Sequence, residues 1–146
     1  MISIDPGKKG CIVRWEGTTP ISIIDNPYIG NKVDIDKLYD LIKPALTIVV
    51  EDVHTSPRMG VVGAGGFMYS LGAIHALSKD KKLVKLLPKR WKNIMGMYGK
   101  PKPYALEVVK RLMPEQFEKM IGPYPNRVDR AEAVLMGLAY FKLGGE

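Results

Sequence analysis

The 146-residue chain has one cysteine, two histidines and no long apolar run. A single cysteine excludes a disulfide framework within the chain. One cysteine and two histidines also fall short of the four ligands of a usual structural zinc site. No stretch approaches the roughly 20 apolar residues that a membrane-spanning helix needs. Any metal ion bound by this chain must therefore be held by oxygen atoms.

Acidic residues are the minority charge. The chain has 22 Lys and Arg against 15 Asp and Glu, a formal net charge of +7. This balance favours a polyanionic partner such as nucleic acid. The length predicts one domain over residues 1–146. The first residues lack the basic and apolar regions of a signal peptide, so we expect a cytoplasmic protein, bacterial or in a phage-infected host, with no membrane contact.

Hydrophobic spacing divides the chain into short strands and helices. Strands are predicted at residues 1–5, 11–16, 20–25, 46–51 and 83–87. Helices are predicted at residues 33–43, 67–79, 88–95, 103–113, 114–122 and 128–142. Residues 52–66, with Pro57 and several glycines, predict a mobile loop. The order predicts an α/β ribonuclease H-like fold, whose mixed five-stranded sheet has a three-strand meander, two parallel strands and helices on both faces.

Two predicted strands and the last predicted helix carry carboxylates at informative positions. Asp5 ends the first strand and Glu51 ends the buried strand at 46–51, so neighbouring strands would bring both to one sheet edge. Asp129 and Glu132 are three residues apart and share one helix face. Each acid alone also suits a turn or a helix end. Together they favour an oxygen-only cluster for two Mg²⁺ or Mn²⁺ ions about 4 Å apart, of the kind that hydrolyses phosphodiesters.

Five segments carry a resemblance to a known family. They are IDPGKKG at 4–10, IVVEDVH at 48–54, a glycine-rich loop leading into FMYSLG at 67–72, LPKRWKNIMG at 87–96, and DRAEAVLMGLAYF at 129–141. Together they resemble the RuvC family of Holliday-junction resolvases, particularly its compact bacteriophage-type members. The resemblance implies that the metal-binding and catalytic acids are Asp5, Glu51, Asp129 and Glu132. Glu132 departs from the best-known bacterial enzymes, which have Asp at this position.

The same resemblance implies a substrate and an assembly. Members of the family are homodimers that bind four-way DNA junctions and make paired nicks, without a small-molecule cofactor. Two alternatives stay open from the residues. One is the same chemistry on forks, flaps or RNA–DNA hybrids, and the other is a non-catalytic DNA-binding module of the same fold.

Basic residues are concentrated between residues 79 and 92. Within PKRWK, we expect Lys89, Arg90 and Lys92 to contact DNA phosphates, and the resemblance gives Lys92 a catalytic place near the scissile bond. A second lysine is expected further along the chain, and Lys100 and Lys102 both fit.

Three further residues are candidate DNA contacts. Lys8 and Lys9 follow Asp5 and fit either contact with the DNA backbone or an ordinary turn. Phe67 follows the glycine-rich loop, near the place where the family has an aromatic that stacks on an unpaired base. A core position is the alternative for Phe67.

Overall fold

The computed structural model describes residues 1–56 and 58–145. Pro57, which belongs to the predicted mobile loop, lies outside the described residues. Within the described residues, no helix has the length and hydrophobicity required to span a bilayer.

The predicted mixed five-stranded sheet is confirmed. The strands are β1 (Ile2–Ile4), β2 (Cys11–Glu16), β3 (Thr19–Asp25), β6 (Thr47–Glu51) and β7 (Lys82–Leu86). Their order in the sheet is β3-β2-β1-β6-β7. The first three strands form the antiparallel meander, and β6 runs parallel to both β1 and β7.

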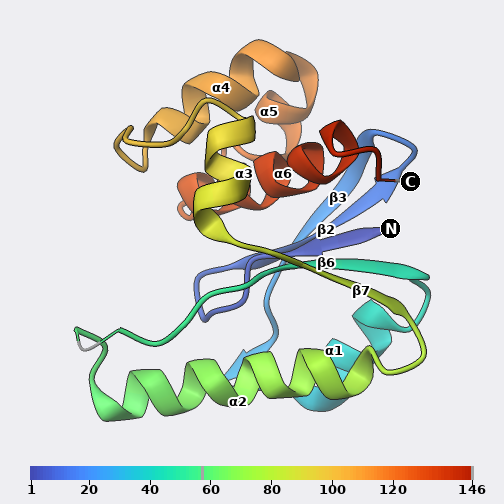
Figure 1. Cartoon of the computed structure of the whole chain (residues 1–146), viewed down its shortest axis with the longest axis vertical. Coiled ribbons are helices and arrows are strands. Elements are labelled where there is room, and N and C mark those ends of the chain that lie inside the picture. The colour runs from blue at the N-terminus through green and yellow to red at the C-terminus, as the bar shows by residue number, and fades with distance from the viewer. Residues whose placement is uncertain (57, 146) are drawn as a thin grey trace.

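Helices cover both faces of the sheet (Figure 1). On one face lie α1 (Ile35–Ile42) and α2 (Val61–Leu77). On the other lie α3 (Pro88–Ile94), α4 (Tyr104–Leu112), α5 (Pro114–Met120) and α6 (Arg127–Lys142). Because successive strand residues point to opposite faces, β6 contributes to two cores. Ile48 and Val50 join the cluster with α1 and α2, whereas Val49 joins the cluster with α6.

Helix α6 is fixed against the sheet along most of its length. All residues from Arg130 to Gly137 are buried, as the apolar circumference of this segment predicts. The Ser3 hydroxyl donates a hydrogen bond to the Ala133 carbonyl at 3.0 Å, and Trp15 Nε1 donates to Ser3 Oγ at 2.9 Å. A side chain at Gly137 would overlap the Trp15 ring. The position of α6 above β1 is therefore closely defined.

The predicted loop at 52–66 is wrong in its second half. Helix α2 begins at Val61, although the glycine content favours a loop there. Glycine costs about 1 kcal/mol relative to alanine inside a helix, a cost that tertiary packing can outweigh. At Gly66 the packing reason is visible, because a Cβ atom would overlap the Asn31 carbonyl of a neighbouring segment.

That neighbouring segment is a small hairpin that the sequence patterns above did not predict. Strands β4 (Tyr28–Ile29) and β5 (Lys32–Val33) pair antiparallel in a sheet of their own. Gly30 and Asn31 form the turn, and Gly30 has a φ of +61°. A Gly-Asn pair between short runs is a recognised signal for a two-residue hairpin, so the sequence did contain this information.

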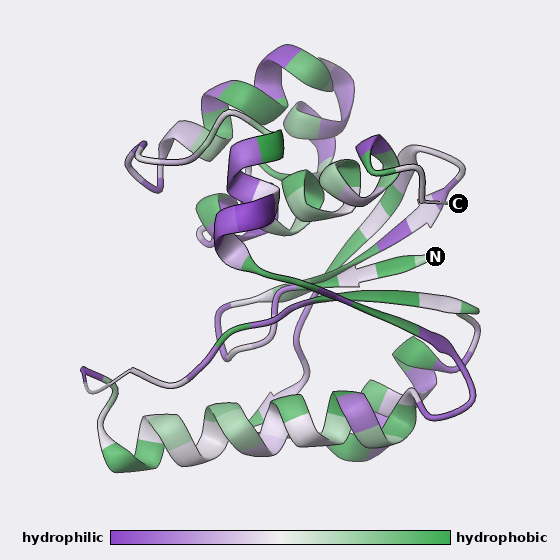
Figure 2. Cartoon of the chain, viewed as in Figure 1, coloured by the Kyte–Doolittle hydropathy of each residue, from purple (hydrophilic) through white to green (hydrophobic). Residues whose placement is uncertain are grey.

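One face of α2 is apolar yet exposed. Val61 is 89% exposed, Val62 68% and Met68 49%. Gly72 and Ala76 are exposed on the same helix. Figure 2 shows few hydrophilic residues along α2, in contrast to α3. An exposed apolar helix face of this kind is typical of an interaction surface.

Candidate active site

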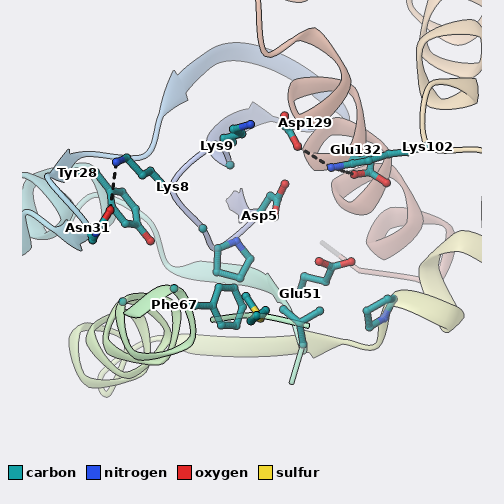
Figure 3. A pocket seen from close by; sticks show the side chains of 18 of the residues that line it. Asp5, Lys8, Lys9, Tyr28, Asn31, Glu51, Phe67, Lys102, Asp129 and Glu132 are labelled. Atoms are coloured by element: carbon teal, nitrogen blue, oxygen red, sulfur yellow. Dashed lines mark hydrogen bonds and ion pairs between the residues drawn. The ribbon is translucent and has the colours of Figure 1, made fainter. Parts of the chain in front are cut away.

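The ends of two parallel strands bring the first pair of acids together. The register of β1 against β6 places Ile4 opposite Val50, so Asp5 and Glu51 follow at the same sheet edge. The first turns of α6 pass this edge and add Asp129 and Glu132 (Figure 3). One carboxylate oxygen each from Asp5, Asp129 and Glu132 lies within 4.8 Å of the others. Glu51 lines the same cavity.

Burial and mutual repulsion make it costly to ionise all of these acids at once. Burial, followed by the negative charges of Glu51 and Glu132, raises the pKa of Asp5 to about 8. Burial also raises the pKa of Glu51, and the hydrogen bond from Trp91 partly offsets that rise. Ionising all four carboxylates is therefore costly without a cation, and a cation bound among them would remove this cost.

Two lysines supply positive charge to the cluster. Lys102 Nζ lies 2.7 Å from Asp129 Oδ1 and 3.1 Å from Glu132 Oε2, and Lys92 Nζ lies 3.3 Å from Glu132 Oε1. Burial opposes the charge on Lys102, but its hydrogen bond to Asp129 and the charge of Glu132 raise the pKa of this ammonium above its ordinary range. Both lysines thus reduce repulsion among the acids.

The donor set fits a hard divalent cation. Every candidate ligand atom in the group of Asp5, Asp129 and Glu132 is a carboxylate oxygen, which suits Mg²⁺ or Mn²⁺. Glu132 Oε1 is buried and accepts no hydrogen bond from the residues that the structure describes. Its ion-pair partner is Lys92, and a bound cation would add the ligand bond that this buried oxygen lacks.

Trp91 is a buried residue that contacts one of the acids. It is 2% exposed, as expected for a core residue, but its indole Nε1 also donates a hydrogen bond to Glu51 Oε1 at 2.8 Å. Sequence reasoning missed this hydrogen bond. No local pattern signals it, because the two residues are 40 positions apart.

The acids open into a cavity of about 530 Å³. Of the other predicted site residues, those that line it are Lys8, Lys9, Phe67, Lys92 and Lys102. Phe67 is half-buried: it packs against the core cluster formed with α1 and α2, and it also lines the cavity.

Three predicted contacts lie outside the lining of this cavity. They are Lys89, Arg90 and Lys100. All three are exposed. Lys89 Nζ lies 5.5 Å from the centre of the Tyr98 ring, and Lys100 Nζ lies 5.7 Å from that of Tyr104. Of the two candidates for the second lysine beside the acids, Lys102 and not Lys100 therefore occupies that place.

Comparison with known proteins gives a match in structure only. No protein-family model matches the sequence, and no curated protein matches it. Solved structures do match, among them one of Thermus thermophilus RuvC (TM-score 0.64) and one of T. thermophilus RuvC in complex with a Holliday junction substrate (TM-score 0.61). Each is 15% identical to this chain and covers 99% of it and 97% of the other chain. The chain has the RuvC fold.

The RuvC fold confirms the ribonuclease H-like architecture that the order of strands and helices predicted. It also confirms the resemblance in fold over nearly the whole chain, although identity is low. In this RuvC-like arrangement, the acids converge from β1, β6 and α6, which are separated in sequence and adjacent in space.

Proposed function

We propose that this protein is a metal-dependent endonuclease that resolves four-way (Holliday) DNA junctions by paired phosphodiester hydrolysis. The observation that carries the proposal is the group formed by Asp5, Asp129 and Glu132 at the strand ends of a RuvC fold. One of the matching RuvC structures holds a Holliday junction substrate, which supports the choice of substrate. The net charge of +7 supports a polyanionic partner.

The acids would hold two Mg²⁺ or Mn²⁺ ions, which supply activation of the attacking water and stabilisation of the leaving oxygen. The metal ligands in this proposal are Asp5, Glu51, Asp129 and Glu132. The raised pKa of Asp5 favours the protonated acid at neutral pH. Asp5 must therefore lose this proton before its carboxylate can act as a ligand. Lys92 and Lys102 lie beside the carboxylates, where their ammonium groups counter the repulsion between the acids and an incoming phosphate.

We further propose that two copies of the chain act together. A four-way junction offers two equivalent strands, so a homodimer with twofold symmetry matches it, with one acidic site for each cut. The exposed apolar face of α2 supports this assembly, because Gly72 and Ala76 allow another helix to approach closely.

The decisive experiment compares DNA substrates and metals. Labelled four-way junction, Y-fork, flap, RNA–DNA hybrid and linear duplex of matched sequence are incubated with Mg²⁺, with Mn²⁺ or with EDTA. Asp5→Asn serves as the control. We expect paired, metal-dependent nicks in the junction, and no cleavage but retained binding by the variant.

Other outcomes would redirect the proposal. Equal cleavage of forks, flaps or RNA–DNA hybrids would keep the nuclease and reject junction selectivity. Tight binding without cleavage in either metal would indicate a non-catalytic DNA-binding module.

A further inference from the structure

The cavity that contains the acids continues to a second wall that the proposed chemistry does not use. This wall, called the hairpin wall below, consists of Lys8, Lys9, Tyr28, Asn31 and Gly63. It combines the turn after β1, the β4–β5 hairpin and the first half of α2. In Figure 3, Lys8, Tyr28 and Asn31 lie across the cavity from Asp129, Glu132 and Lys102.

The hairpin is held firmly against α2. Tyr28 and Ser70 share a hydrogen bond of 2.6 Å between their hydroxyl groups. The absence of a side chain at Gly66 lets the Asn31 backbone approach the helix. Lys32 Nζ lies 5.7 Å from the centre of the Tyr69 ring, and Val33 is buried. These contacts make the hairpin a fixed wall of the cavity.

The polar groups of this wall suit an anion. Lys8 Nζ donates a hydrogen bond to Asn31 Oδ1 at 3.3 Å, which leaves the Asn31 amide nitrogen and the other ammonium hydrogens to donate elsewhere. Lys9, the next residue in the same turn, also lines the cavity and adds a second cation. None of the residues that form the hairpin wall is acidic. At Gly63 a Cβ atom would meet nothing within 4 Å, so the cavity is bordered there by bare backbone.

We propose that the hairpin wall binds the DNA phosphate next to the scissile one, with Lys8 and Asn31 as its principal donors. The bound strand crosses the cavity from the acids to the hairpin. A cavity of about 530 Å³ lies in the range of small-ligand sites, which suits one locally separated strand. This inference rests on the proposed function, because it takes the cleaved DNA strand as the occupant.

The test uses two substitutions at one exposed position. Asn31→Asp keeps the size of the side chain and its acceptor for Lys8, but replaces the amide donor with a negative charge. If no DNA phosphate lies beside Asn31 and Lys8, this variant binds DNA as well as the wild type does. If Asn31 contacts a phosphate, binding of labelled four-way junction in EDTA falls about tenfold, and Asn31→Ala loses less.

A lysine pair provides the matched control. The salt dependence of junction binding is the slope of the log binding constant against log salt concentration. Lys8→Ala should reduce this slope by about one, the change expected for the loss of one phosphate contact. Lys142→Ala removes an exposed cation at the end of α6 and should leave the slope unchanged. Wild-type binding by Asn31→Asp, or an unchanged slope for Lys8→Ala, would overturn the inference.

Cleavage in Mg²⁺ separates this inference from the proposed function. If the wild type cleaves no DNA, the proposed nuclease is rejected, while the binding measurements in EDTA still decide whether the hairpin wall contacts phosphate. If the wild type cleaves and the Asn31 and Lys8 variants match it in binding and kcat/KM, only the hairpin wall is rejected.

Discussion

Asp5 is the residue with the clearest pH signature. Its pKa of about 8 in the folded chain exceeds the ordinary value of 3.8, so the folded state binds a proton that the unfolded state has released between these two values. The unfolding free energy therefore falls as pH rises through this window. The stability contributed by protonated Asp5 is fully present below pH 3.8 and is lost as pH approaches 8.

Asp5→Asn mimics the protonated acid and should remove this dependence. Without metal, we expect the variant to melt at least about 3 °C above the wild type at about pH 8, and close to it at about pH 4. Thermal unfolding in EDTA from about pH 4 to about pH 9 measures the difference. Melting curves that stay parallel across this range would contradict the assigned pKa.

Trp91 offers a prediction about metal affinity. Trp91→Phe keeps an aromatic ring in the core but removes the hydrogen bond to Glu51. Groups that orient a metal ligand typically contribute tenfold or more to affinity, so we expect Mg²⁺ binding to weaken by about tenfold in calorimetry. Trp15→Phe is the control, because Trp15 donates to Ser3 and not to an acid.

Fluorescence gives an independent measurement from the same pair of variants. The chain has two tryptophans, so Trp15→Phe leaves Trp91 as the only one. Its emission should change when Mn²⁺ binds, and Trp91→Phe should show a much smaller change. Equal responses in the two variants would contradict a metal site beside Trp91.

Lys102 and Lys100 differ in position despite their similar sequence context. Lys102 contacts Asp129 and Glu132, whereas Lys100 is exposed beside Tyr104. We expect Lys102→Gln to lower kcat for junction cleavage at least about tenfold, a loss typical of removing a charge near developing negative charge. Lys100→Gln should lose far less. Single-turnover cleavage of both variants decides between them, and equal losses would contradict this assignment.

At the scale of elements, the contact between α2 and the β4–β5 hairpin explains an unusual helix. Alanine normally stabilises a helix relative to glycine by about 1 kcal/mol. A methyl group added at Gly65 would meet nothing within 4 Å, but one added at Gly66 would overlap the Asn31 carbonyl. There is therefore room for an alanine side chain at position 65 but not at position 66.

Substitution of these glycines should have opposite effects. Gly65→Ala should raise the melting temperature by about 2–4 °C, whereas Gly66→Ala should lower it because the hairpin must move. Thermal unfolding of both variants at one protein concentration tests this pair. A stabilised Gly66→Ala protein would show that the hairpin contact is not tight.

At the scale of the whole molecule, the exposed face of α2 predicts the assembly. Gly72→Glu places a charge where the second copy is expected, and should convert the dimer to a monomer in light scattering. Leu46→Glu is the control, because Leu46 is 85% exposed at the start of β6, away from α2. The monomer should lose paired nicking. A dimeric Gly72→Glu protein would exclude this face as the interface.

Local sequence patterns determined the order of the five sheet strands and the six helices, the mixed sheet, and the positions of Asp5 and Glu51 at strand ends, but not the β4–β5 hairpin. These features follow from hydrophobic periodicity, which acts over a few residues. The same patterns misjudged residues 61–66, because glycine content argues for a loop and only packing against the hairpin reveals the helix.

Tertiary structure decided which distant groups meet. Local patterns left Lys100 and Lys102 equivalent, and the fold brings only Lys102 to Asp129, across 27 positions of sequence. Trp91 reaches Glu51 and Lys8 reaches Asn31 in the same way. Periodicity specifies which face of each element is buried. The partners of a polar side chain depend on how those faces pack in three dimensions, which no short stretch of sequence contains.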